Sequence, residues 1–330
     1  MTLLDRRQAL ALVAALPGVD LAFAEQSARA AAWPDRTVRI VSPLTPGGPN
    51  DVSARLIGQR LQEHFRIPFL IENRPGAATR IGNAAVARAA PDGTTLLYAS
   101  AALAVLPSLY SNLSYDWRIH LTPITLAAMA PLFLVVAEQS PAHDLREFIA
   151  LARAQPFGPT FAGPGLATVP HLVTELFIRK VRMVGRTIHF NGEVAATVEL
   201  LAGRADAAFT TLTSALPHIQ RGKLRVLAVA SNQRSVLFPA APTLLEQGID
   251  DVSGSAWFGF LSPAGLPPAV IDAIHEAIAG VLAEARVTEA MAGAGLQATA
   301  SKTPKEFSDF IAAEARKWHG VIKDANITAE

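Results

Sequence analysis

Short apolar segments with strand character alternate with helical patterns through most of the chain. "TVRIVS" (37–42) predicts a strand, and the apolar positions of 51–65 have the spacing of a helix. The pattern continues with predicted strands at 68–72 and 94–100 and a helix at 80–90. Short buried strands separated by helices predict a parallel sheet with helices on both faces, which is an α/β fold.

The alternation restarts after about residue 130, which predicts a second unit of the same kind. Its predicted segments are a strand at 131–137, a helix at 144–154, a strand, loop and helix over 159–181, and further segments at 186–190, 193–203, 205–211 and 223–230. An apolar strand at 257–263 then leads to helices at 267–285 and from Thr303 onward. We expect two α/β lobes, with 33–132 and 256–330 in the first and 133–255 in the second. Two crossover strands, near 131–137 and 256–262, would connect them.

The first 24 residues predict a secretory signal peptide. Arg6-Arg7 precede an apolar run from Ala9 to Leu16, and Ala22-Phe23-Ala24 offers the small residues of a cleavage site. Cleavage as far as residue 32 stays open because Ala28 begins a second small-residue cluster. "DRRQAL" is a partial match to a twin-arginine signal, and the alternative is an N-terminal helix packed on the domain. Export predicts a periplasmic protein.

Charge and cysteine content exclude several classes of function. The 330 residues carry 29 Lys and Arg against 28 Asp and Glu, for a formal charge of +1, and no run of like charge stands out. The chain therefore lacks the electrostatic footprint of a protein that binds nucleic acid or an anionic membrane. It contains no cysteine, which fits an oxidising compartment without requiring one.

A glycine-rich turn, Pro46-Gly47-Gly48-Pro49, joins the first predicted strand to the first helix. The first N–H groups of a helix lack intrahelical partners and its dipole is positive there, so a carboxylate or phosphate can dock without a cationic side chain. Thr45 would add a hydroxyl, and Asp51 is expected as a cap or first-turn acid. The alternative is that the glycines only allow a tight turn.

The second unit repeats this design, with a Gly163-Pro164-Gly165 loop and Thr168 before a helix. The acidic residue that a dinucleotide site needs about twenty residues later is missing. His171 and Glu175 lie four apart on one helical face, but no third metal ligand is evident, which favours a structural hydrogen bond. We expect no cofactor and no metal.

Catalytic motifs are absent from the sequence. It has no G-x-S-x-G elbow, no Walker lysine, no H-E-x-x-H and no cysteine nucleophile. Two anion-binding helix starts, one on each lobe, together with a signal peptide predict a solute-binding protein rather than an enzyme. A periplasmic hydrolase with a Ser-His-Asp triad assembled in space is a weaker alternative.

Ordered motifs along the whole mature chain resemble one receptor family. "WPDRTVRIVSPLTPGGPNDVSARLIGQRL" is similar to its opening strand, P-x-x-P-G-G-x-x-D loop and first helix. "IENRPGAATRIGNAAVARAAPDGTTLLYAS", "LPSLY", "HLVTELF", "ALPHIQRGKLRVLAVAS" and "FPAAPTLLEQG" continue the match in order. The sequence thus resembles the Bug family, the extracytoplasmic solute-binding receptors of tripartite tricarboxylate transporters.

The resemblance implies a periplasmic-binding-protein type II-like fold that closes on a small organic acid. Backbone amides of 45–51 and 163–168 would hold one carboxylate, with the strand ends at 100–101 and 209–211 lining the cleft. The candidate ligand-binding residues are Thr45, Pro46, Gly47, Gly48, Asp51, Ser100, Ala101, Gly165, Ala167, Thr168, His171, Asn191, Thr210 and Thr211.

Two departures from the family pattern concern the far end of the ligand. The segment 188–192 is I-H-F-N-G where the family usually has V-P-Y-K-G, and Thr210 stands where an aspartate is common. The expected ligand is a mono-, di- or tricarboxylate, delivered to the membrane permease subunits of a tripartite tricarboxylate transporter by a monomeric receptor. A receptor that feeds a signalling partner is the alternative.

Overall fold

The computed structural model describes residues 33–328. The proposed signal peptide at 1–24 and its alternative cleavage positions up to 32 lie outside the described residues. Among the described helices, none has both the length and the apolar character that crossing a bilayer requires.

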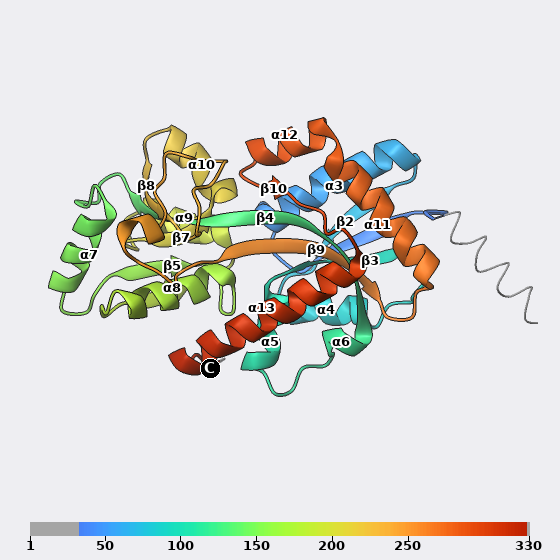
Figure 1. The fold of residues 1–330 in the computed structure, drawn as a ribbon, viewed down its shortest axis with the longest axis horizontal. Helices are drawn as coiled ribbons and strands as arrows, with labels where there is room; N and C mark the ends of the chain where they lie inside the picture. Colours follow the sequence, from blue (N-terminus) through green and yellow to red (C-terminus); the bar gives the residue numbers. More distant parts are fainter. Residues whose placement is uncertain (1–32, 329–330) are drawn as a thin grey trace, which may run out of the picture.

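The first lobe begins with three strands that form one edge of a large sheet (Figure 1). β1 lies between β2 and β3 and pairs with both in parallel. The elements in this part of the chain are β1 (Val38–Ser42), α3 (Pro49–Phe65), β2 (Phe69–Asn73), α4 (Arg80–Ala87), β3 (Thr95–Ser100), α5 (Ala102–Leu109) and α6 (Trp117–His120). The parallel order places the carboxyl ends of β1 and β3 at the same edge, so the loops that follow them meet there.

Two long strands cross from one lobe to the other. β4 (Leu121–Ala137) pairs antiparallel with β9 (Ser255–Pro263) as far as Pro131, and from Leu132 onward with strands of the second lobe. β9 also pairs antiparallel with β3, which gives the order β10-β4-β9-β3-β1-β2. The sheet is therefore mixed, and the expectation of a purely parallel sheet was wrong. The crossing strands are the reason, because they are not parts of local βα units and are free to run antiparallel.

The second lobe is a smaller α/β unit built around the end of β4. Its elements are α7 (Leu145–Ala154), β5 (Thr160–Gly163), α8 (Val169–Lys180), β6 (Arg186–His189), α9 (Glu193–Leu201), β7 (Ala208–Thr211), α10 (Leu212–Gln220), β8 (Leu224–Val229) and the 3₁₀ helix η1 (Leu245–Gln247). β7 and β8 pair antiparallel with β4, and β5 pairs parallel with β6. As in the first lobe, helices follow strands after short connections.

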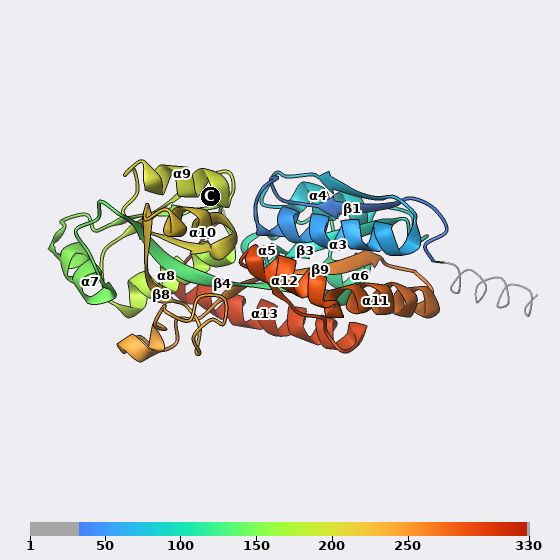
Figure 2. The ribbon, with the colours of Figure 1, turned by 90° about the horizontal axis from the view of Figure 1, so that it is seen from above.

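The C-terminal segment returns to the first lobe and spans both. Its elements are α11 (Pro268–Ala283), α12 (Ala285–Gly293), β10 (Gln297–Ala298) and α13 (Pro304–Ala325). α13 contacts α5 in the first lobe and α8 in the second, with Trp318 fully buried (Figures 1 and 2). We propose lobe boundaries at 132/133 and 255/256, because the pairing of β4 with β9 ends at Pro131 and Ser255.

Candidate ligand-binding site

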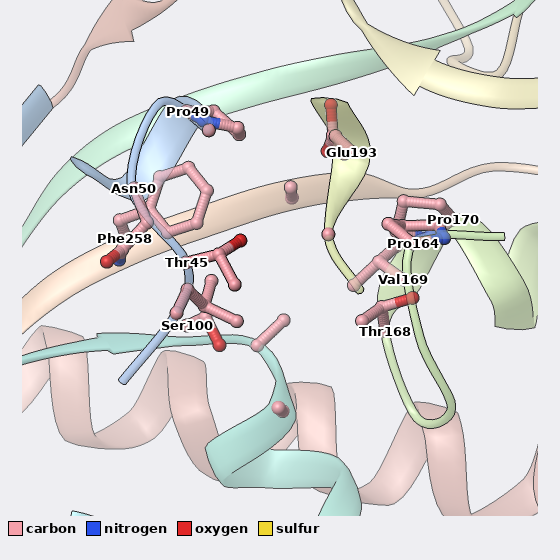
Figure 3. Close-up of a pocket in the computed structure, with 16 residues that line it drawn as sticks. Thr45, Pro49, Asn50, Ser100, Pro164, Thr168, Val169, Pro170, Glu193 and Phe258 are labelled. Atoms are coloured by element: carbon pink, nitrogen blue, oxygen red, sulfur yellow. The ribbon is translucent and has the colours of Figure 1, made fainter. Parts of the chain in front are cut away.

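A cavity lies between the two lobes, at the edge where the strands end (Figure 3). The first lobe contributes Thr45, the start of α3 and the 100–102 segment. The second contributes Pro164, the start of α8 and the Gly192-Glu193 pair, and Ala256 and Phe258 of β9 complete the lining. An outer pocket shares Thr45 and Thr168 with the cavity and extends past Gly165, Asn191 and Tyr110.

Four helices begin at this cavity, two from each lobe. Their first residues, Pro49 of α3, Ala102 of α5, Val169 of α8 and Glu193 of α9, all belong to its lining. In α3 the first intrahelical bond runs from Val52 N–H to the Gly48 carbonyl, so the N–H of Asn50 precedes the bonded series. Four positive helix ends bordering one space favour an anion there even without cationic side chains.

Charged side chains are almost excluded from the lining. Among the described residues that border the cavity or the outer pocket, none is a lysine, an arginine or a histidine. The acid Glu193 is the one formally charged residue there. Backbone N–H groups and hydroxyls must therefore supply the attraction for any anion.

The first loop places Thr45 and Gly48 on the cavity but turns other groups away from it. The Thr45 hydroxyl points into the cleft (Figure 3). The Gly47 N–H donates to Asp51 Oδ2 at 3.0 Å, and Gly47 has φ +81°. The Gly47 N–H and Asp51 thus bind each other, and Asp51 takes the role of a first-turn acid. Pro46, Gly47 and Asp51 lie outside the lining and shape the turn.

Asp51 is held in a polar network behind the loop. Arg55 donates to its two oxygens at 2.9 and 3.0 Å, and Asn73 Nδ2 donates to Oδ1 at 2.9 Å. Burial opposes ionisation of Asp51, but the hydrogen bonds from Arg55, Gly47 and Asn73 outweigh it and lower its pKa. The charged acid thus fixes the loop to α3 and β2.

Asn50 is a cavity residue that the sequence analysis missed. Its Nδ2 donates to the Tyr98 carbonyl at 3.1 Å, and its Oδ1 accepts from Ser42 Oγ. These bonds tie the start of α3 to the ends of β3 and β1. The side chain points away from the cleft centre (Figure 3), so it positions the helix end.

The opposite wall contains a buried carboxyl group, that of Glu193. Its Oε2 accepts hydrogen bonds from Thr211 Oγ1 at 2.7 Å, Thr211 N at 3.2 Å and Thr210 Oγ1 at 3.2 Å. Burial raises the pKa of Glu193, and the hydrogen bonds from Thr211 and Thr210 act against that rise. Thr210 and Thr211 were expected to bind the ligand. They lie outside the lining and bind Glu193 instead.

Comparison with known proteins agrees with this arrangement. The sequence profile of the TctC family, the "Tripartite tricarboxylate transporter family receptor", matches residues 53–327. Protein BugT of Bordetella pertussis is 35% identical over 294 residues, which cover 88% of this chain and 90% of BugT. The chain belongs to the TctC receptor family.

Two solved structures of similar architecture contain a carboxylate ligand. Rpa4515 of R. palustris "with adipate" has a TM-score of 0.86 and 28% identity, and covers 90% of this chain and 99% of its own. MatC of Rhodopseudomonas palustris "with bound malate" has a TM-score of 0.79 and 28% identity, with coverages of 88% and 100%. The fold of this TctC receptor is that of a periplasmic binding protein.

In this TctC receptor, some residues of the second glycine loop line the cavity or the outer pocket, and others lie behind the lining. Thr168 lines the cavity, but its hydroxyl donates to the Gly165 carbonyl at 2.7 Å and so closes its own loop. Gly165 and Asn191 border the outer pocket. Ala167 is fully buried with φ +64° and lies outside the lining of both pockets.

His171 packs within the second lobe rather than on the cavity. Its ring makes an edge-on contact with His189 at 4.5 Å between centroids. Its Nε2 lies 3.9 Å from Glu175 Oε1, which is too long for the expected hydrogen bond. Burial, together with His189, lowers the pKa of His171 to about 3. Within residues 33–328, no group of three or more His, Cys, Asp or Glu side chains is placed to hold a metal.

The lobes touch at the mouth of the cleft. A Cβ on Gly192, which has φ +96°, would overlap Thr45 Oγ1 of the opposite lobe. A Cβ on Gly47 would contact Val194 Cγ2 at 3.7 Å. In this TctC receptor, glycines at 47 and 192 therefore allow the two walls to approach each other. Of the predicted strand-end residues, Ser100 and Ala101 line the cavity.

Proposed function

We propose that this protein is an exported receptor that captures a small organic acid between its lobes and delivers it to the permease subunits of a tripartite tricarboxylate-type transporter. The observation that carries the proposal is the meeting of four helix N-termini at an interlobe cavity with no cationic side chain among the described residues that line it. Membership of the TctC receptor family supports the transport role.

A carboxylate is the ligand group that this geometry favours. The N–H groups at the start of α3, with the Thr45 hydroxyl, offer several hydrogen bonds to one anion, each contributing about 1.5–3 kcal/mol when the acceptor is charged. Adipate in the Rpa4515 structure and malate in the MatC structure are small carboxylates. They support a small organic acid as the ligand class.

Closure of the lobes would complete the site. A ligand that contacts both walls binds the closed arrangement better than an open one and so shifts the equilibrium toward it. β4 and β9 are the two crossings about which the lobes would hinge. The receptor would act as a monomer, would bind its ligand without converting it, and would need no cofactor.

Native mass spectrometry of the protein from a periplasmic fraction tests the proposal. We expect one small carboxylic acid bound per chain, and an N-terminus that begins within residues 24–32. Calorimetry with that acid should then show one site. An intact Met1 on cytoplasmic protein would contradict export, and sustained conversion of the bound compound would contradict a binding function.

A further inference from the structure

The two walls of the cavity differ in the charge that they present. The first-lobe wall offers the starts of α3 and α5 with the hydroxyls of Thr45 and Ser100. The second-lobe wall offers the start of α8 and Glu193, the one formally charged residue in the described lining. An anionic group therefore meets favourable dipoles at one wall and an acidic residue at the other.

Hydrogen bonds from the second lobe hold the carboxyl group of Glu193 in place. Three hydrogen bonds converge on Oε2 from Thr210 and Thr211. These two residues end β7 and precede α10, so the carboxyl group also lies at the N-terminus of a second helix. Oε2 accepts all three of these bonds, so Oε1 is the oxygen that the two threonines do not engage.

The hydrogen-bonding chemistry of the Glu193 carboxyl group determines which ligand groups can lie next to it. In the ionised form of Glu193, Oε1 accepts a hydrogen bond from an ammonium or hydroxyl group, whereas a second carboxylate placed there would face a like charge. Within residues 33–328, the lining holds no lysine, arginine or histidine to offset two neighbouring anions. A dicarboxylate bound across the cavity would thus lack a partner at the far wall.

We propose that Glu193 is the specificity-determining residue of the cavity, and that the ligand is a small monocarboxylate whose far end carries a hydrogen-bond donor, with ammonium preferred to hydroxyl. This inference rests on the proposed function, because it presumes that the other wall binds a carboxylate. It deepens that function by assigning the second polar group of the ligand.

Calorimetry at neutral pH with two matched ligand series tests the proposal. The first series is butyrate, 4-hydroxybutyrate, 4-aminobutyrate and succinate, and the second is the corresponding six-carbon set ending in adipate. In at least one series we expect the amino acid to bind at least tenfold more tightly than the dicarboxylate, with the hydroxy acid between them. Equal or tighter binding of the dicarboxylate in both series would overturn the assignment of Glu193.

Glu193→Gln keeps the shape of the side chain and removes its charge. We expect the ratio of amino-acid to dicarboxylate affinity to fall at least tenfold in this variant. Glu199→Gln is the matched control, because Glu199 lies on the same helix and pairs with Arg204 away from the cavity. An unchanged ratio in Glu193→Gln would refute the proposal.

Failure of the inference differs from failure of the proposed function. If no member of either series binds the wild-type protein, the carboxylate-binding function itself is contradicted. If carboxylates bind but dicarboxylates are preferred, only the role of Glu193 is refuted. The wild-type ratio requires no variant, so the proposal stays testable even if Glu193→Gln fails to fold.

Discussion

Asp51 and Glu193 occupy similar places in the two lobes and have opposite environments. Each lies in the first turn of a helix that follows a glycine-containing loop at the cavity. Asp51 turns away and is held by Arg55, and its pKa is lowered. Glu193 borders the cavity, is held only by neutral donors, and its pKa is raised by burial. Of these two acids, only Glu193 belongs to the cavity lining.

The difference shows how one local design serves two purposes. In the first lobe the acid neutralises a surface arginine and fixes the loop, which leaves the start of α3 free to bind an anion. In the second lobe the acid binds the strand-end threonines and becomes part of the wall. The predictions below test whether these two walls act as described.

We expect the largest loss of ligand affinity when a side chain fills the narrow gap between the two walls. Gly192→Ala adds a Cβ that meets Thr45 across the cleft, at a residue whose φ of +96° already disfavours any side chain. We expect a loss of about a hundredfold in affinity, or about 2.7 kcal/mol, measured by calorimetry. Gly222→Ala is the control, because Gly222 also has a positive φ but a Cβ there would contact nothing within 4 Å. Similar affinity losses in both variants would contradict contact between the walls.

Removing the charge of Asp51 should destabilise the first wall without acting on the ligand directly. Asp51→Asn weakens charged hydrogen bonds to Arg55 and should lower the free energy of unfolding by about 1–2 kcal/mol near neutral pH. Since the folded pKa lies below the ordinary 3.8, this stabilisation is present above that value and is lost as the pH falls below it. Urea unfolding at pH 7 and pH 3 measures the difference. Asp309→Asn, which breaks an exposed pair with Lys305, should cost much less.

The sequence was sufficient to predict the α/β alternation and the position of the cleft, but not the full crossing strand or the second wall. β4 begins at Leu121, ten residues before the predicted strand, because Pro123 and Pro131 are unfavourable in strand patterns. α5 and α10 were also missed, and each contains a proline. Local sequence patterns cannot predict where a proline is tolerated in a strand or helix. This depends on whether the backbone N–H group that proline lacks would have been needed for a hydrogen bond.

Glu193 was missed for a related reason. An acid in the first turn of a helix is ordinarily explained by the helix dipole, and this explanation suffices for Asp51. What separates the two is the cation: Arg55 follows Asp51 by four residues, and no basic residue follows Glu193 until Arg204. The adjacent threonines at 210–211 were a second signal, but their partner is visible only in three dimensions.

A larger side chain at Gly48 should block ligand binding at the first-lobe wall. Gly48 has φ −81°, which any residue adopts, and a Cβ there would approach no atom more closely than the Thr45 carbonyl at 3.9 Å. Gly48→Val should therefore fold normally, yet fill ligand space and reduce affinity more than tenfold, above about 1.4 kcal/mol. Thr45→Ala, which removes one hydroxyl, should cost less. Calorimetry on variants with unchanged circular dichroism decides the matter, and wild-type affinity for Gly48→Val would mean that the loop is only a turn.

For the pH dependence of the stability that Glu193 contributes, the sign of the change is the test. Because burial raises its folded pKa above the ordinary 4.5, the proton-linked stability of Glu193 is present in acid and is lost as the pH rises through the folded pKa. Glu193→Gln carries no such group, so its stability relative to the wild type should increase with pH from about pH 4.5 upward.

Urea unfolding of the ligand-free proteins across that range measures this difference. His171 and His189 titrate in both proteins and cancel in the comparison. A Gln variant that loses stability relative to the wild type as the pH rises would show that the threonines and the start of α10 stabilise the charged form more than burial disfavours it. Glu193 would then resemble Asp51 in its energetics, and the two walls would differ only in where their acids point.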